Sequence, residues 1–594
     1  MKHKIIKYFR ENQNVRLSFR GMFFSLLIME IISSAATIVD SLIVSEYIGD
    51  AAVASIGLTY SIGTFQKLLS GLIAGGTRIA CSDAIGHADS KKANQIFSTS
   101  VSVSIILLVG LALLGWSFAP ELASLLGARH DAELIIPTAR YIRGIMPGLP
   151  FVLLTALLIP IIQIDGSDRL ARISVFVTIG VDILLDFSAV YLFEDRLLGV
   201  GLATSLSYIA AFLVIALHYF NKKAQFRFSI KAIRPVLFIR TIRYGFYEAF
   251  CRLMTIVRTI TINYIILSIA STNAMSAFSL YSNLKTFLTA IPTAIGSAAI
   301  LFASNLIVKR DLKGLRQVFK SSLFYGVVVM SILGIFVFIL AEPVFSLFSL
   351  HEETVSYLVF LFKLFAFILP LWGIKYFYVS YFQGIGLRKL STIFSVFGEL
   401  IFAALPTWLF SRFLGINGIW IGLATTEVLS VLLILIFAII HNKRFPRSIE
   451  GMLFLPKHFE DEEVSMLDLS AQNIKGMEEI HYLLERFCIE NEIDENRTMA
   501  IRLSVEELSS YLLMNYKKRE HLIDVQLRYC RKEDDVILNF RYNDPSFNPT
   551  TIHDGNEGDH DETMKNIGLQ LIYKMSKDIR YVHFVSYAEL LVEL

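Results

Sequence analysis

Charged side chains are scarce in this chain of 594 residues. They make up only 18% of the sequence, whereas an average globular protein has about 25%. Cysteine is scarcer still, with four scattered residues, which excludes a disulfide framework and a zinc cluster. Hydrophobic residues reach 54% and the mean hydropathy is +0.56. This composition excludes a disordered, collagen-like or entirely soluble protein, and it indicates that lipid surrounds much of the chain.

The few charges are divided unevenly along the sequence. Residues 1–450 contain 39 basic and 24 acidic side chains, whereas residues 451–594 contain 16 basic and 28 acidic ones. The first part is therefore sparsely charged and basic, and the second is densely charged and acidic. We expect a membrane domain followed by an acidic domain in water.

Apolar stretches recur throughout residues 20–442, and about 20 such residues form a helix that crosses the hydrocarbon core. We expect twelve membrane-spanning helices. They are 20–43, 52–77, 96–118, 138–163, 172–193, 200–220, 244–268, 277–303, 321–341, 356–383, 391–411 and 418–441. The expected fold class is thus an all-α membrane protein, followed by an α/β sandwich domain.

Lysine and arginine gather before the first span and in every second loop after it. The lead of residues 1–20 is basic, and the loop 221–243 alone holds seven such residues. Short basic loops stay on the cytoplasmic side of a membrane. Because the number of spans is even, we expect both termini and the acidic domain inside the cell, with the protein in the cell (inner) membrane.

One internal repeat has a period near 222 residues. Ser82, Asp89 and Lys91 recur as Ser304, Asp311 and Lys313. This period equals six spans, so two six-helix lobes share one orientation, as in transporters whose two bundles rock about a central site. The expected divisions are a basic lead (1–20), a first lobe (21–220), a basic loop (221–243), a second lobe (244–442), a linker (443–456) and the acidic domain (457–594).

Several short motifs, taken together, resemble those of a known protein family. They are Val39 to Ser41, Ile48 to Gly57, Gly75 to Ser82, Gly86 to Asn94, Gly166, Val181 to Asp186, and Tyr381 to Gly386. Over residues 15–445 the chain resembles the multidrug and toxic compound extrusion (MATE) family. The resemblance implies a monomeric transporter in membrane lipid, not an enzyme, with no cofactor. It would export a small organic compound, often a cation, against an inward flow of protons or sodium ions.

Acidic residues inside spans are the candidates for the coupling site, because charge in hydrocarbon is costly and rarely kept without a role. Asp40 lies in the first span, and Asp182 and Asp186 lie one helical turn apart in the fifth. The resemblance assigns Asp40 and Asp186 to cation coupling. Asp182 stands where the family commonly has Asn, and this extra acid leaves the choice between proton and sodium open.

Four further charged residues are candidates for the substrate cavity: Glu30, Glu248, Arg252 and Arg258. Glu30 and Arg252 occupy equivalent positions of the repeat, so they could pair across the lobes. The alternative is that Arg252 neutralises Glu248 one turn earlier. The other ionisable residues within the spans include Lys67, Lys375, Glu399 and Glu427; for the two lysines, snorkelling to the membrane surface is a sufficient explanation.

The acidic domain should contain helices at 474–490, 497–516 and 564–577 and strands at 522–530, 535–541 and 579–594. It resembles the histidine-kinase-type ATPase fold of anti-sigma-factor serine kinases. Glu507 and Gly568 match that pattern, whereas Tyr511 replaces the metal-holding Asn and Asp544 replaces a Gly. We therefore expect the fold to be kept and ATP binding to be weak or lost.

Three roles remain open for this domain: docking onto the basic inner loops, binding of a cytoplasmic protein partner, or neither. Two other classes of function compete with efflux, namely a flippase for a lipid-linked oligosaccharide and a membrane-bound ATP-binding signalling protein. The sequence contains no P-loop, no motif for nucleophilic catalysis and no cluster of metal ligands. We expect no catalytic residue, no metal and no nucleic-acid partner.

Overall fold

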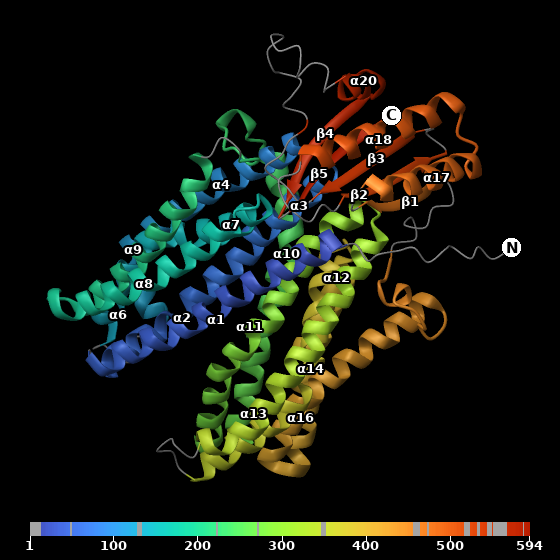
Figure 1. Cartoon of the computed structure of the whole chain (residues 1–594). Helices are drawn as coiled ribbons and strands as arrows, with labels where there is room; N and C mark the ends of the chain where they lie inside the picture. Colours follow the sequence, from blue (N-terminus) through green and yellow to red (C-terminus); the bar gives the residue numbers. More distant parts are fainter. Residues whose placement is uncertain are drawn as a thin grey trace.

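The fold is taken from a computed structural model of the whole chain (Figure 1). It describes residues 13–47, 50–126, 134–220, 224–269, 272–345, 352–455, 464–471, 474–515, 523–531, 535–542, 549, 567–585 and 587–594. Two groups of helices meet beside a small sheet, and in Figure 1 they diverge away from it.

The first group of helices, called the first lobe here, runs from α1 to α9. Its elements are α1 (Gln13–Tyr47), α2 (Asp50–Ser70), the π-helical turn η1 (Gly71–Gly75), α3 (Gly76–Gly86), α4 (Ser90–Ser117), α5 (Ala119–Leu125), α6 (Ile135–Ile145), α7 (Leu149–Ile164), α8 (Asp168–Leu192) and α9 (Arg196–Ala216). Short 3-10 turns follow at Met146–Gly148, Leu217–Phe220 and Ile230–Ala232.

The second lobe runs from α10 to α16. Its elements are α10 (Pro235–Ile269), α11 (Thr272–Val308), α12 (Leu312–Phe324), the π-helical turn η7 (Tyr325–Val329), α13 (Met330–Phe345), α14 (Glu352–Gly384), α15 (Arg388–Ser395), the π-helical turn η8 (Val396–Ile401) and α16 (Phe402–Asn442). A last 3-10 turn, Glu450–Met452, lies between this lobe and the sheet.

Among the described residues, nine helices are long and apolar enough to cross a membrane. They coincide with the expected spans from the third onward. The expected eleventh and twelfth spans fall in one continuous stretch, 388–442, because the turn at Gly415 (φ 60°, ψ −135°) joins two helices with no intervening loop. A positive φ of this kind suits glycine, which has no Cβ to collide with the backbone. The first expected span lies in α1, and the second, 52–77, runs through α2 and η1 into the first residues of α3.

The 222-residue repeat is visible in the backbone. Asp89 accepts a hydrogen bond from the Lys92 amide (2.9 Å) at the start of α4, and Asp311 accepts one from the Gly314 amide (2.7 Å) at the start of α12. The residues just before these caps, Ala88 and Arg310, have φ values of 54° and 53°. Equivalent residues thus make equivalent helix starts in the two lobes.

The C-terminal domain is a five-stranded antiparallel sheet with helices. Its strands are β1 (Val464–Ala471), β2 (Ile523–Cys530), β3 (Asp535–Tyr542), β4 (Asp578–Phe584) and β5 (Tyr587–Glu593), in the order β1-β2-β3-β5-β4. The helices are α17 (Ile474–Glu490), α18 (Glu495–Asn515) and α20 (Ile567–Met575). Strand β1 was not expected from the sequence; it lies at the edge of the sheet and pairs with β2, which lies far along the chain.

The two faces of this sheet differ in chemistry. Strand residues such as Leu527, Leu538 and Leu590 pack with α17, α18 and α20 in one apolar core. The alternating residues point the other way. They include Asp524, Arg541 and Glu589, which lie opposite one another on β2, β3 and β5 and are all buried. Charged residues on the face away from the domain's core can be buried only by another part of the chain.

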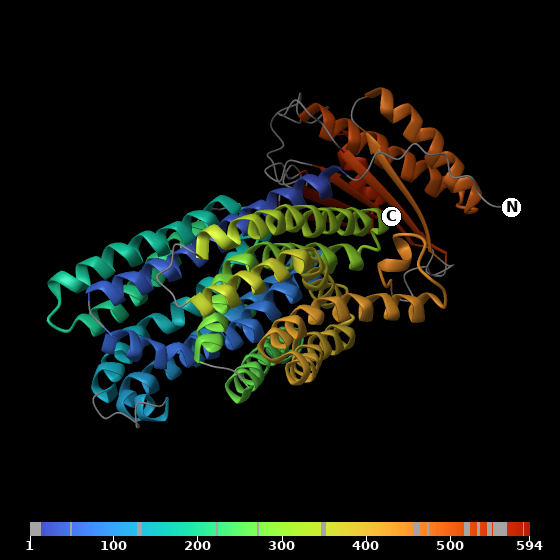
Figure 2. The same cartoon turned by 90° about the horizontal axis from the view of Figure 1, so that it is seen from below.

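Both views place the sheet at one end of the helices, next to the start of α1 (Figures 1 and 2). At this end the lobes are in direct contact. The hydroxyl of Ser304 donates to that of Ser82 at 2.7 Å, and Ser82 donates to the carbonyl of Leu301 at 2.9 Å. Because Ser82 and Ser304 are repeat equivalents, their contact lies on the axis that relates the lobes.

Glycines allow the lobes to approach this closely. A Cβ added to Gly245 of α10 would lie 1.8 Å from the carbonyl oxygen of Leu72 in η1, and one added to Gly76 of α3 would lie 2.2 Å from the carbonyl oxygen of Thr241. Such distances are shorter than any real contact, so the backbones would have to separate.

Replacement of Gly245 by alanine is expected to destabilise the protein by about 1–3 kcal/mol, the usual cost of overpacking. The measurement is the thermal unfolding midpoint of the detergent-solubilised full chain. Gly110→Ala is the matched control, since its added Cβ has nothing within 4 Å. Equal midpoints for the two variants would show that the α10–η1 contact does not limit stability.

Candidate functional site

Two buried carboxylates lie inside the first lobe. Asp182 and Asp186 both project from α8, are 9% and 1% exposed, and are separated by one helical turn. The side chains of Ser207 and Thr204, on the neighbouring helix α9, interact with Asp182. The predicted pair therefore lies inside the lobe and not towards lipid, and hydroxyl groups line it.

The third predicted acid, Asp40, belongs to α1, and its side chain lies outside the described part of the structure. Its helix packs directly against α8. The structure thus brings the helices of the three predicted coupling residues together.

The predicted cavity residues divide into two groups. Glu248 forms ion pairs with Arg252 (3.3 Å) and with Arg78 of α3 (3.0 Å), so it links the lobes. Glu30 is close enough to Arg252 to interact electrostatically, but the ion pair of Arg252 goes to Glu248. The local alternative, pairing one turn apart, is the arrangement that the structure has.

Arg258 lies elsewhere, in a charged cluster inside the second lobe. It pairs with Glu399 of η8. Lys375 of α14 lies between Glu399 and Glu427, at 2.9 Å from each, and is only 2% exposed. Lys375 therefore does not snorkel to the membrane surface; it holds two carboxylates together within the lobe.

A further cation, Lys285 of α11, was missed in the sequence. Its ammonium lies 4.9 Å from the centre of the Trp372 ring and 5.8 Å from that of Tyr281, within the range of a cation–π interaction. A lysine within an apolar span was the signal that could have found it. The interior of the second lobe thus contains lysine, arginine and glutamate, whereas the interior of the first contains the aspartates Asp182 and Asp186.

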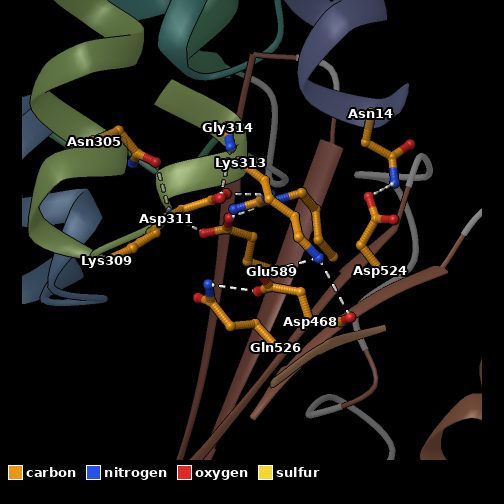
Figure 3. A network of polar contacts seen from close by, with 11 residues as sticks. Asn14, Asn305, Lys309, Asp311, Lys313, Gly314, Asp468, Asp524, Gln526 and Glu589 are labelled. Atoms are coloured by element: carbon orange, nitrogen blue, oxygen red, sulfur yellow. Dashed lines mark hydrogen bonds and ion pairs between the residues drawn. The ribbon is translucent and has the colours of Figure 1, made fainter. Parts of the chain in front are cut away.

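A second polar network joins the transporter lobes to the C-terminal domain (Figure 3). Glu589 of β5 pairs with Lys309, at the end of α11, and accepts from Arg541 at 2.9 Å; Arg541 also pairs with Asp311 at 2.8 Å. We call these four residues the docking network. Burial alone would raise the pKa of Glu589, but Lys309 and Arg541 together hold that pKa below its ordinary value, so Glu589 is ionised at neutral pH.

Two more contacts surround the docking network. Lys313 of α12 pairs with Asp468 of β1 at 3.2 Å, and Asn14 of α1 donates to Asp524 of β2 at 2.9 Å. In Figure 3 these side chains approach from opposite sides, the helices on one and the sheet on the other. Of the three roles that the sequence left open for this domain, docking onto a basic loop is the one that agrees with the contacts of Lys309 and Lys313.

The residues predicted for a degenerate nucleotide site are only partly described. Glu507 and Tyr511 lie on α18, and Gly568 lies in the first turn of α20; Asp544 lies outside the described residues. A hollow of about 10 Å³ beside α18 and α20 is lined by Leu508, Pro549, Ile572, Tyr573, Ile579 and Leu590. It is smaller than the roughly 300–1,000 Å³ of small-molecule sites, and it has no charged lining.

Comparison with solved structures defines the class of protein. The chain matches "Crystal structure of MATE in the straight conformation" with a TM-score of 0.65 at 19% identity, covering 72% of this chain and 97% of that one. It matches "Outward-facing conformation of a multidrug resistance MATE family transporter of the MOP superfamily" with a TM-score of 0.65, also at 19% identity, covering 72% and 96%. The fold is that of a multi-pass membrane transporter.

The sequence places the chain within that class. The family model MatE matches residues 25–188 and 248–409, more than half of the chain, so the protein belongs to the MatE family. The two matched segments correspond to the two lobes and confirm the predicted repeat. Members of this family are transporters and not enzymes.

Curated relatives cover most of the helical part. The "Probable multidrug resistance protein YoeA" of Bacillus subtilis (strain 168) is 22% identical, covering 69% of this chain and 90% of its own. The "Multidrug export protein MepA" of Staphylococcus saprophyticus is 24% identical, covering 65% and 85%. The resemblance to transporters of the MATE family is thereby confirmed.

Replacement of Lys375 by methionine should destabilise the protein by about 3–5 kcal/mol, because Glu427 loses the cation with which it pairs and Glu399 keeps Arg258 alone. Thermal unfolding of the solubilised full chain measures this. Adding Glu427→Gln should recover part of the loss, since it removes the uncompensated charge.

Lys577→Met serves as the comparison, because the Lys577–Asp535 pair lies at the surface of the C-terminal domain, where ion pairs contribute little. If Lys375→Met and Lys577→Met unfold at the same temperature, the cluster does not support the second lobe.

Proposed function

We propose that this protein exports organic compounds, chiefly cations, in exchange for protons or sodium ions. The observation that carries the proposal is the pair of buried carboxylates, Asp182 and Asp186, one turn apart in α8 and beside α1. The relatives named as multidrug export proteins support the same direction of transport. The transporter works as a monomer surrounded by lipid and needs no cofactor beyond the transported ion.

The proposed coupling residues are Asp40, Asp182 and Asp186. Two carboxylates close together in a low-dielectric interior repel one another when both are ionised. A proton, or a sodium ion held by carboxylate and hydroxyl oxygens, removes this repulsion. Uptake of the ion from one side and its release to the other then supplies the energy for moving the passenger in the opposite direction.

The proposed passenger cavity lies between the lobes, near Glu30, Glu248 and Arg252, and extends into the second lobe towards Arg258. Glu248 supports this position, because its ion pair with Arg78 joins α10 to α3, while its second pair, with Arg252, lies within α10. Pairs at a junction of two bundles can break and reform as the bundles rock. A cationic passenger would compete with the two arginines for Glu248.

The proposed arrangement in the cell membrane has twelve spans and both termini in the cytoplasm. Basic residues favour the cytoplasmic side, and Lys309 and Lys313 lie at the end where the sheet lies. Residues 457–594 would then form a regulatory cytoplasmic domain that also offers a surface to a protein partner. The apolar lining of the hollow beside α18 supports a kinase-like fold that has lost ATP binding.

The test is transport of ethidium by the full-length protein in proteoliposomes, with proton and sodium gradients imposed separately. One of the two gradients should drive transport. Asp182→Asn and Asp186→Asn should each abolish the gradient-driven part, because an amide cannot exchange a proton and carries no charge for sodium.

Asp195→Asn is a matched control, since Asp195 caps α9 at a partly exposed loop and pairs there with Arg140. It should retain gradient-driven transport. Undiminished transport by both Asp182→Asn and Asp186→Asn would eliminate the coupling assignment.

A further inference from the structure

The C-terminal domain touches both lobes at the end where they meet. The turn between β4 and β5, represented by Phe584, Val585 and Tyr587, is called the hairpin tip here. The Val585 amide donates to the carbonyl of Ile164, at the end of α7 in the first lobe, at 2.8 Å. The Phe584 ring meets the edge of Phe302, in α11 of the second lobe, with centroids 5.3 Å apart. One short turn thus contacts one helix of each lobe.

The hairpin tip is part of the apolar core shared by the lobes. Phe584 and Tyr587 are both 0% exposed and Val585 is 6% exposed, and all three belong to the same cluster of buried residues as Phe19 of α1 and Phe302 of α11. Separation of the lobes at this end would expose these rings to water. Burial of apolar surface therefore favours the closed arrangement of the lobes.

The polar contacts add a second attachment, mainly to the second lobe. Lys309 and Asp311 of that lobe meet Glu589 and Arg541 of the domain, and Lys313 meets Asp468. On the first lobe, the Arg580 guanidinium lies 3.4 Å from the carbonyl of His87, and Asn14 donates to Asp524. The domain is thus held at several points on either side of the junction.

The docking network is balanced in charge on each side of the interface. The lobe contributes one cation and one anion, Lys309 and Asp311, and the domain contributes Arg541 and Glu589. After separation, Arg541 and Glu589 remain paired with each other at 2.9 Å, and water can solvate Lys309 and Asp311. Neither surface is left with an uncompensated net charge. The docking network can therefore separate without leaving a buried charge unpaired, and the apolar contacts of the hairpin tip are the part of the interface that opposes separation.

We propose that the C-terminal domain is a clamp: the hairpin tip and the docking network hold the two lobes together at the domain side, and the domain must detach before that end can open. Rocking of two bundles about a central site requires each end to open in turn. The clamp therefore controls how often the protein adopts the conformation that is open at the domain side. Any event that pulls the sheet away from α11 and α12 would release it.

The test measures lobe separation directly in the full-length protein. Spin labels replace two exposed residues, Lys91 of α4 and Lys320 of α12, in a chain whose four native cysteines are alanine, and pulsed paramagnetic resonance gives their distance in liposomes. Phe584→Ala and Lys313→Glu should each add a longer distance and raise the open-to-closed ratio about fivefold or more, the range of coupling between linked sites. This readout needs neither passenger nor coupling ion, so its failure is separable from failure of the proposed function.

A charge exchange distinguishes loss of docking from misfolding. Lys313→Glu places a carboxylate against Asp468, and adding Asp468→Lys restores an opposite pair with its polarity reversed. The double variant should return the distances to those of the parent. Lys577→Glu is the control, since Lys577 pairs with Asp535 of its own domain, and it should change nothing. Unaltered distances in both Phe584→Ala and Lys313→Glu, or no recovery in the double variant, would overturn the clamp.

Discussion

A charged side chain withdrawn from water must find an opposite charge or a set of polar partners. This requirement explains how the buried ionisable groups of the protein are arranged. Lys375 holds Glu399 and Glu427 together inside the second lobe, and Glu248 joins two arginines where the lobes meet. Asp182 and Asp186 are arranged differently, because two like charges share one face of α8 and the partners of Asp182 are the hydroxyl groups of Ser207 and Thr204. That contrast separates groups that support the structure from groups suited to exchange an ion.

The two lobes repeat one backbone plan but carry different charges. Asp89 and Asp311 start equivalent helices, and Ser82 meets Ser304 where the lobes touch. In the described part of the chain, the copy in the second lobe forms ion pairs with the C-terminal domain through Asp311 and its neighbour Lys309, whereas the copy in the first lobe contacts the domain through the carbonyl of His87. A structural cap in one repeat has thus become an attachment site in the other, which makes a nearly symmetric transporter asymmetric at one end.

Much of the helical fold could be predicted from the lengths of the apolar stretches and from the repeat. Inside a membrane the backbone must satisfy its own hydrogen bonds, and a long apolar helix is one of the few structures that does so. The sequence also predicts that Asp182 and Asp186 share one face of their helix, because they are four residues apart. Strand β1 was not predicted, because Val464–Ala471 becomes a strand by pairing with β2, which lies far along the chain. The role of Lys375 was not predicted either, since its two carboxylates come from helices distant in the sequence.

The sequence by itself determined the lobes, their repeat, the family and the acidic character of the last domain. These properties rest on local composition and periodicity, which each segment carries alone. Only the tertiary structure decided which charges meet. The docking network joins residues that are far apart in the sequence: 280 residues separate Lys309 from Glu589. The pairing of its four members depends on how the sheet lies against α11 and α12. Long-range contacts of this kind follow from the packing of whole elements, which no short segment encodes.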